Sequence, residues 1–256
     1  MTGDLRNTTG ECQDQAFVNP DRQADIVLSL IMPVYNEAEC LRRVLDEALE
    51  TTDRAPFTCE IIAVDDASED GSASILQEYQ RRHPRRIRVL RHQTNRGIAA
   101  AFRTLDAAAR GAYIFLIGSD GQWRMDECRR MMAMRDKYEV VVGRRASKKY
   151  SLMRKVISGA YNFLPVILFG VRTYDAGSIK LYRADVALIP LISRGVFDEA
   201  ERLIRAQRRG LRIGAIDVEH LPRKGGRAIG VSYRLLFQAA GDLARCWWDI
   251  VILGRN

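Results

Sequence analysis

Residues 26–37 read IVLSLIMPVYNE, an apolar run that leads directly into the loop sequence Pro33–Glu37. A run rich in Ile, Val and Leu is typical of a strand that is buried on both faces of a sheet. The helical pattern of Ala38–Glu50 follows at once, which predicts a strand–loop–helix unit. Proline and asparagine are also common where a strand passes into a helix, so the loop alone does not establish a binding site.

The same alternation of apolar runs and helical stretches continues through the first half of the chain. We expect further strands at Glu60–Val64, Ile87–Arg91, Tyr113–Ile117 and Val140–Val142, and helices at Ser72–Arg82, Ile98–Ala109 and Asp126–Lys137. Strands that alternate with helices form parallel sheets with crossover connections. The sequence therefore predicts an α/β fold with a Rossmann-like, doubly wound, mostly parallel sheet and helices on both faces. Ligands of such sheets bind beyond the carboxyl ends of the strands.

The chain divides by composition into a tail, one domain and a terminal helix. Residues 1–24 are polar and show no hydrophobic period, which predicts a disordered tail. Residues 25–230 are long enough for one large domain, with a nucleotide-binding half at about 25–143 and an acceptor half at about 144–230. Residues 231–256 are rich in apolar side chains and predict a C-terminal apolar helix.

The net charge of +8 suits an anionic partner such as a phosphorylated substrate or an acidic lipid. No nucleic-acid-binding motif accompanies that charge, so we expect no nucleic acid partner. The five cysteines lack metal-ligand spacing, and no secretory signal is visible, which predicts a cytoplasmic protein with reduced thiols. The sequence leaves the oligomeric state open.

Two apolar segments indicate contact with a lipid surface. Val156–Val171 is interrupted by Asn162 and Pro165, and is shorter than the roughly 20 residues that span a bilayer. The terminal helix carries Trp247 and Trp248, and tryptophan is frequent at membrane interfaces. We therefore expect peripheral contact with the inner face of a membrane, with burial in the core as the alternative.

The second expected strand ends in two consecutive carboxylates, Asp65 and Asp66. Turn formation and helix capping account for the residues that follow, Asp70–Ser72, but they leave this pair without a structural purpose. Carboxylates placed side by side at the end of a strand repel each other unless they bind donors or a metal. We therefore predict that the pair contacts a base edge, a ribose or a metal ion.

Two further loops lie at the same expected edge of the sheet. Asn95–Gly97 precedes an Ala-rich helix, where the amides of a helix N-terminus can bind a diphosphate, or where Asn95 can simply cap the helix. Gly118–Gln122 supplies the carboxylate of Asp120 and the amide oxygen of Gln122 between glycines. Such oxygens can hold Mg²⁺ or Mn²⁺, since these ions complete their coordination shell with substrate phosphates and water.

Taken together, these loops resemble the family 2 glycosyltransferases of the GT-A fold, and most closely the branch that transfers sugars to polyprenyl phosphates. The resemblance covers about residues 27–230 and implies that Asp120 and Gln122 meet a metal ion. The residues that it places at the nucleotide sugar are Pro33, Tyr35, Asn36, Glu37, Asp65, Asp66, Asn95, Gly97, Ser119 and Asp120.

One departure from the family pattern concerns the metal. The family usually has Asp-x-Asp in this loop, whereas the first acidic position here is Gly118, so the loop offers a single carboxylate. We therefore expect weak metal binding, or binding that relies on the donor phosphates. A noncatalytic homologue with a weakened metal site is the alternative.

The acceptor half contains further candidates that the resemblance suggests. Asp175, Asp198 and Asp120 are the candidate catalytic residues, although Asp175 can also form a turn and Asp198 can favour the start of a helix. The candidates for phosphate or acceptor binding are Arg144, Lys180, His220, Arg223 and Arg227.

The reaction that the resemblance implies is an inverting transfer of a sugar from a UDP- or GDP-linked donor to an acceptor. A polyprenyl phosphate at the membrane surface is the expected acceptor, and it needs no general base because a phosphate is already an anion. A soluble aglycone is the alternative. A dinucleotide-dependent oxidoreductase is disfavoured, since GxGxxG does not follow the first strand.

Overall fold

The computed structural model describes residues 25–145, 152–222 and 233–255. Their strands form one mixed sheet in the order β3-β2-β1-β4-β6-β5-β7. The strands are β1 (Leu28–Val34), β2 (Cys59–Asp65), β3 (Ile87–Arg91), β4 (Tyr113–Leu116), β5 (Val140–Arg145), β6 (Lys180–Arg183) and β7 (Ile213–Val218). Only β6 runs antiparallel to its neighbours in this sheet, because β1, β2, β3 and β4 pair in parallel and so do β5 and β7.

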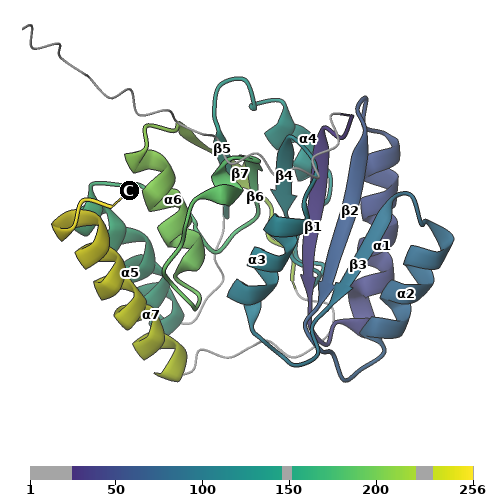
Figure 1. Cartoon of the computed structure of the whole chain (residues 1–256), viewed down its shortest axis with the longest axis horizontal. Helices are drawn as coiled ribbons and strands as arrows, with labels where there is room; N and C mark the ends of the chain where they lie inside the picture. Colours follow the sequence, from purple (N-terminus) through teal and green to yellow (C-terminus); the bar gives the residue numbers. More distant parts are fainter. Residues whose placement is uncertain (1–24, 146–151, 223–232, 256) are drawn as a thin grey trace, which may run out of the picture.

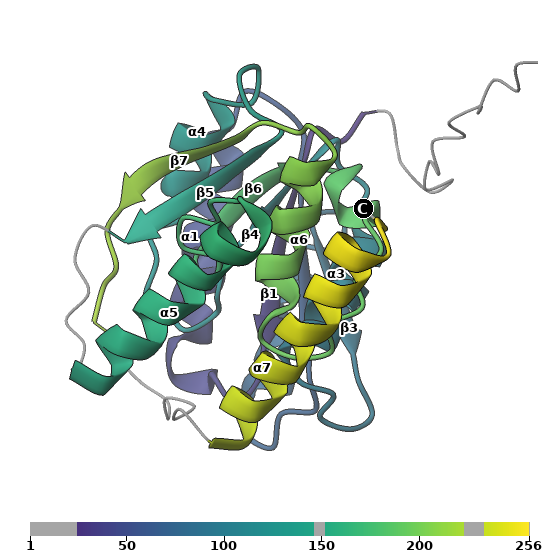
Figure 2. The same cartoon turned by 90° about the vertical axis from the view of Figure 1, so that its left-hand side faces the viewer.

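Helices cover both faces of the sheet, as Figures 1 and 2 show, which confirms the predicted fold class. The α-helices are α1 (Ala38–Asp53), α2 (Ser72–Arg82), α3 (Ile98–Ala108), α4 (Glu127–Met132), α5 (Leu152–Phe169), α6 (Asp198–Arg208) and α7 (Tyr233–Trp247). Two short elements complete the set, the 3₁₀ turn η1 (Val186–Leu188) and the π-helical turn η2 (Trp248–Ile252). In Figure 1, α5, α6 and α7 gather at one end of the molecule, away from α1 and α2.

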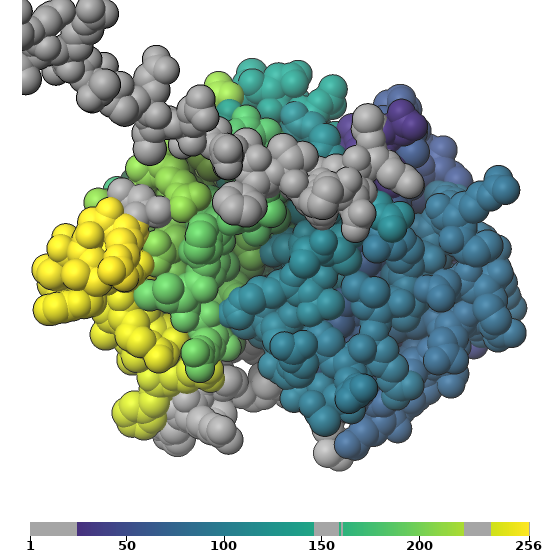
Figure 3. Space-filling view, in the orientation of Figure 1, coloured from purple at the N-terminus to yellow at the C-terminus, as the bar shows by residue number. Residues whose placement is uncertain are grey.

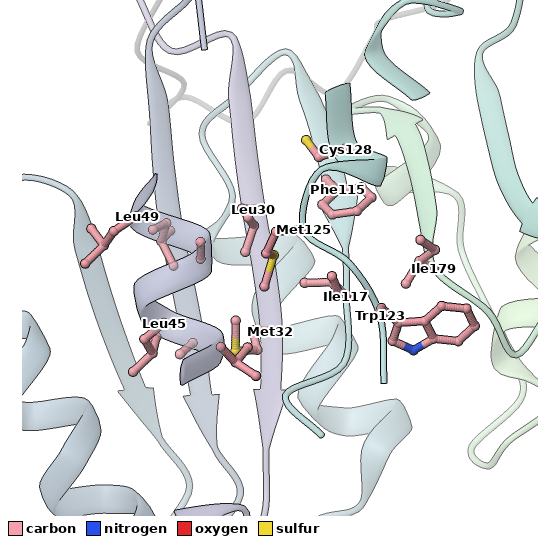
Figure 4. Packing of buried hydrophobic residues seen from close by; sticks show 14 of the residues in the cluster. Leu30, Met32, Leu45, Leu49, Phe115, Ile117, Trp123, Met125, Cys128 and Ile179 are labelled. Atoms are coloured by element: carbon pink, nitrogen blue, oxygen red, sulfur yellow. The ribbon is translucent and has the colours of Figure 1, made fainter. Parts of the chain in front are cut away.

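The sheet separates two hydrophobic clusters, and the alternation of side chains along β1 explains how. Leu30 and Met32 pack against α1, α2 and α4, whereas Ile31 faces the cluster that includes α3 and α6. Successive strand side chains point to opposite faces, so a strand that is buried on both sides is apolar throughout. The first cluster also contains Trp123 and Met125, which anchor the loop after β4 (Figure 4).

Three details differ from the sequence-based expectation. The helix predicted at Asp126–Lys137 is shorter, because α4 ends at Met132. The antiparallel direction of β6 and the edge strand β7 were not predicted. β7 buries only Gly214 and Val218, so its sequence lacks the continuous apolar run of a central strand.

Candidate active site

The loops that follow β1 and β2 are tied to each other by hydrogen bonds at the carboxyl end of the sheet. The backbone N–H of Asn36 donates to Ser68 Oγ at 3.0 Å, and the N–H of Glu37 donates to Ser72 Oγ at 2.9 Å. Asn36 Oδ1 accepts the N–H of Glu69 at 2.8 Å. Asn36 has a φ of 55°, a left-handed conformation that asparagine tolerates better than most residues. Backbone strain of this kind concentrates at functional sites.

Asp65 and Asp66 both have structural partners, so the argument that no structural role accounts for them is wrong. Asp65 Oδ1 accepts the N–H of Ser68 at 3.0 Å, and Arg91 Nε lies 3.1 Å from its Oδ2. Both carboxylates are almost completely buried. Contact of this pair with a nucleotide stays a prediction.

Asp66 connects β2 to the loop that precedes α3. Its Oδ1 accepts the N–H of Arg96 at 2.9 Å, and its Oδ2 accepts the N–H of Gly97 at 2.8 Å. His92 Nδ1 lies 2.6 Å from the same Oδ1. Gly97 has a φ of 82°, a conformation that favours glycine. The carboxylate therefore fixes the predicted diphosphate-binding loop at Asn95–Gly97 rather than lying open to solvent.

The Asp120 loop is braced on both sides. Ser119 Oγ donates to Pro33 O at 2.7 Å, which joins this loop to the one after β1. Gln122 Nε2 donates to Leu221 O at 3.2 Å, while Gln122 O accepts the N–H of Leu221 at 2.8 Å. The structure thus brings Pro33, Ser119, Asp120 and Gln122 together, as predicted from the order of the strands.

The donor set of this loop fits a hard divalent cation that takes most of its ligands from a substrate. Asp120 Oδ1 accepts the N–H of Gln122 at 3.1 Å, and no described residue bonds its Oδ2. A Cβ placed on Gly118 would lie 3.3 Å from Asp120 Oδ1, so Gly118 stands beside the carboxylate of Asp120. Residues 25–145, 152–222 and 233–255 contain no group of three or more His, Cys, Asp or Glu side chains suited to a metal.

Asp175 lies in the second half of the chain, just before β6, and is paired with Arg145. Arg145 Nε lies 2.7 Å from Asp175 Oδ2, and a second guanidinium nitrogen lies 2.6 Å from Oδ1. The guanidinium carbon is 6.0 Å from the centroid of Trp123, whose ring meets His220 edge-on at 4.7 Å. Since Asp175 is buried in a two-point ion pair, this geometry favours the positioning of Arg145 over proton transfer.

Asp198 begins α6 and carries a perturbed carboxyl group. Arg103 of α3 lies 3.0 Å from its Oδ2, but neither carboxylate oxygen accepts an aligned hydrogen bond from a described residue. Burial, together with the neighbouring charge of Glu199, raises the pKa of Asp198 to about 8. Burial thus makes the charged form of Asp198 less favourable than that of an exposed carboxylate.

Two of the predicted phosphate-binding residues, Lys180 and Arg144, are held in ion pairs. Lys180 is buried, where its Nζ donates to Ala176 O at 2.6 Å and to Ser178 O at 2.8 Å and lies 3.0 Å from Glu199 Oε2. Arg144 is exposed and pairs with Asp217 at 2.6 Å. Arg223 and Arg227 lie outside the described residues. Lys180 thus belongs to an internal ion pair, because its ammonium group is enclosed by carbonyls and a carboxylate.

Comparison with known proteins places this geometry in a family. The sequence pattern of glycosyl transferase family 2 matches residues 29–187. The chain belongs to glycosyl transferase family 2. This family segment contains β1 to β6 and the loops around Pro33, Asp66 and Asp120. The resemblance found in the loop sequences is thereby confirmed.

Relatives of this family 2 chain include enzymes named for polyprenyl acceptors. A dolichyl-phosphate β-glucosyltransferase of Trichomonas vaginalis is 29% identical over 77% of the chain and 64% of its own length. A dodecaprenyl-phosphate galacturonate synthase of Rhizobium johnstonii is 29% identical over 80% of the chain and 62% of its own length. The chain thus spans less than two thirds of the length of these relatives.

Solved structures with the same fold include enzymes crystallised with a nucleotide or a nucleotide sugar. The glucosyl-3-phosphoglycerate synthase of Mycobacterium tuberculosis, in complex with Mn²⁺ and UDP, superposes with a TM-score of 0.68 at 15% identity, over 93% of this chain and 86% of that one. A mannosyltransferase of Pyrobaculum calidifontis with GDP-Man and Mn²⁺ gives 0.61 at 20% identity, over 88% and 66%. At these identities the likeness establishes the fold alone.

Proposed function

We propose that this chain transfers a sugar, with inversion, from a nucleotide diphosphate sugar to a polyprenyl phosphate at a membrane surface. The observation that carries the lipid acceptor is a set of exposed apolar side chains on the two helices that flank the acceptor half. On α5 and in η2, Phe163 and Ile167 are 63% and 62% exposed and Trp248 is 57% exposed. The acceptors named for the two relatives above support the same assignment.

The donor binds, in this proposal, across the loops at the carboxyl ends of β1, β2 and β4. Tyr35 is partly exposed there and offers an aromatic face to the base, and the amides in the first turn of α3, just after the Asn95–Gly97 loop, face the diphosphate. Asp120 and Gln122 would hold Mg²⁺ or Mn²⁺. The ion supplies positive charge that stabilises the leaving nucleotide diphosphate.

The burial of Asp198 favours a phosphate acceptor over a hydroxyl acceptor. A hydroxyl nucleophile needs a base within reach, whereas the carboxyl group of Asp198 is 1% exposed and its Oδ2 lies 3.0 Å from Arg103. A phosphate oxygen is already anionic and attacks without one. The residues of the chain then orient the acceptor and exclude water from the donor.

Asp198→Asn tests this proposal by separating the two acceptor classes. With a UDP- or GDP-sugar and a polyprenyl phosphate, we expect kcat to change by less than about tenfold, because no proton has to be removed. With a hydroxyl acceptor, loss of a general base lowers kcat by about 10²–10⁴-fold. The measurement is product formation with wild type and variant on both acceptors. Transfer by wild type to hydroxyl acceptors alone would refute the lipid assignment.

Removal of exposed apolar side chains should weaken membrane binding. For the double variant Phe163→Ser and Ile167→Ser we expect at least about tenfold weaker sedimentation with anionic lipid vesicles, since burial of one such side chain stabilises binding by about 1.5–3 kcal/mol. Ile98→Ser on α3 is the matched control, because Ile98 is also exposed but lies on another surface. Equal sedimentation of both variants would argue against α5 as a lipid contact.

No helix within the described residues combines the length and the apolar character that a membrane span requires.

A further inference from the structure

The segment 192–196, which we call the ledge, lies between η1 and α6. Burial alternates along it: Ser193 and Gly195 are buried, whereas Ile192, Arg194 and Val196 are exposed. Figures 1 and 2 place the segment beside α3 and on the side of α7, and Figure 3 shows it in green at the surface between them. The ledge therefore presents one cation between two aliphatic side chains.

Two buried carboxylates hold the backbone of the ledge. Glu201 of α6 accepts the N–H groups of residues 192 and 193 at 3.0 and 2.8 Å. Asp242 of α7 accepts the N–H groups of residues 194 and 195 at 3.3 and 3.1 Å. Both carboxylates are fully buried. Four consecutive amides are thus fixed by side chains from two helices, which orients the outward side chains before any ligand arrives.

The carbonyl groups of the ledge are held by two further elements. Arg103 of α3 donates to Ser193 O at 2.6 Å, and the hydroxyl of Tyr161 of α5 donates to Val196 O at 2.7 Å. Arg103 also contacts Asp198, which directly follows the ledge at the start of α6. The ledge therefore connects Asp198 to α5 and α7, which both carry exposed apolar side chains.

Gly195 allows α7 to pack closely on the ledge. A Cβ at this position would lie 2.8 Å from Cδ of Gln238 and 3.2 Å from Asp242 Oδ2, so a larger residue would displace these side chains of α7. The neighbouring Phe237 is 78% exposed and extends the apolar surface beside the ledge. Arg194 has no ion-pair partner among the described residues, and it lies at the edge of this apolar surface. An isolated guanidinium bordered by hydrocarbon is complementary to a phosphate that carries a hydrocarbon chain.

We propose that the ledge binds the acceptor, with Arg194 on the phosphate and Ile192 and Val196 on the hydrocarbon next to it. This inference rests on the proposed phosphate acceptor and assigns its binding residues.

Arg194→Gln tests the ledge directly, with geranyl phosphate as a water-soluble probe and without membranes. We expect binding to weaken at least about tenfold, since a charged hydrogen bond contributes about 1.5–3 kcal/mol, and the KM for the donor sugar to stay unchanged. Arg81→Gln on α2 is the control, because Arg81 is exposed on the opposite side of the sheet. Unchanged binding of geranyl phosphate would overturn the proposal.

A second experiment distinguishes binding of the acceptor phosphate from binding of anionic lipid head groups, which have similar chemistry. If Arg194→Gln weakens sedimentation with anionic vesicles but leaves geranyl phosphate binding unchanged, Arg194 contacts head groups and the ledge is not an acceptor site. The measurement of geranyl phosphate binding does not require sugar transfer. Wild type that binds geranyl phosphate through Arg194 but transfers no sugar to it would contradict the proposed function and leave the ledge supported.

Asp242→Asn tests whether the buried carboxylate shapes the ledge. The variant keeps Arg194 but removes the negative charge that holds two amides and pairs with Arg245, so we expect weaker geranyl phosphate binding in the same direction, by about threefold or more. Asp46→Asn on α1 is the control, because Asp46 accepts the hydroxyl of Tyr79 in the hydrophobic cluster on the other face of the sheet. Equal binding by both variants would contradict a positioning role for Asp242.

Discussion

Replacing Asp120 by asparagine will lower kcat/KM for sugar transfer by about 10²–10³-fold and remove most of its response to Mn²⁺. Asp120 supplies the loop's single carboxylate, and its Oδ2 is left open by the described residues. Asparagine keeps the shape of the side chain but removes its negative charge. The measurement is the initial rate against Mn²⁺ concentration at saturating donor. Asp126→Asn, which alters an exposed carboxylate at the start of α4, serves as the control.

Gly118→Asp is the complementary change, because it adds a second carboxylate to the same loop. A Cβ at Gly118 would be 3.3 Å from Asp120 Oδ1 and 3.7 Å from Trp123 Cδ1, a tight but adjustable fit. We expect half-maximal activation at about tenfold lower Mn²⁺, since hard cations bind more tightly as carboxylates are added. A normal metal response in Asp120→Asn, or its loss in Gly118→Asp, would contradict the assignment of the metal to this loop.

The nucleotide half of the fold could be predicted because its signals are local. The strand at Leu28–Val34 can be recognised from its apolar run, and the helix at Ala38–Asp53 from its amphipathic period. The expected order of the strands then predicts which loops lie together. The same reasoning brought Pro33 and Asp120 to one edge of the sheet, which the structure confirms. The antiparallel β6 was not predicted, because its direction depends on how the chain returns from α5.

The acceptor half was harder to predict because its charges are paired across long sequence distances. Lys180 looks like an exposed cation in the sequence, yet Glu199 encloses it in the fold. Arg194 gave no sequence signal, since its exposure depends on Glu201 and Asp242 holding the backbone around it. The hydrogen bond from the N–H of residue 193 to Glu201 forms only when α6 packs against the ledge, so the sequence alone does not predict it.

The second large effect is expected at Asp66, where asparagine will weaken nucleotide binding by about 100-fold and destabilise the fold by about 2–3 kcal/mol. The carboxylate accepts the N–H groups of Arg96 and Gly97 and meets His92 as well. An amide nitrogen in place of one oxygen turns a donor toward a donor, which leaves a buried polar group without a partner. The predicted diphosphate-binding loop is then released from β2.

Asp70→Asn is the matched control for this prediction, since Asp70 bonds the N–H groups of Ala38 and Ser72 in the same turn and does not reach the Asn95–Gly97 loop. Calorimetric titration with UDP and GDP measures the binding, and urea unfolding measures the stability. We expect Asp70→Asn to lose about 1 kcal/mol of stability and to bind nucleotide like wild type. If Asp66→Asn loses stability but keeps its nucleotide affinity, the carboxylate only supports the fold, and the diphosphate must bind away from the start of α3.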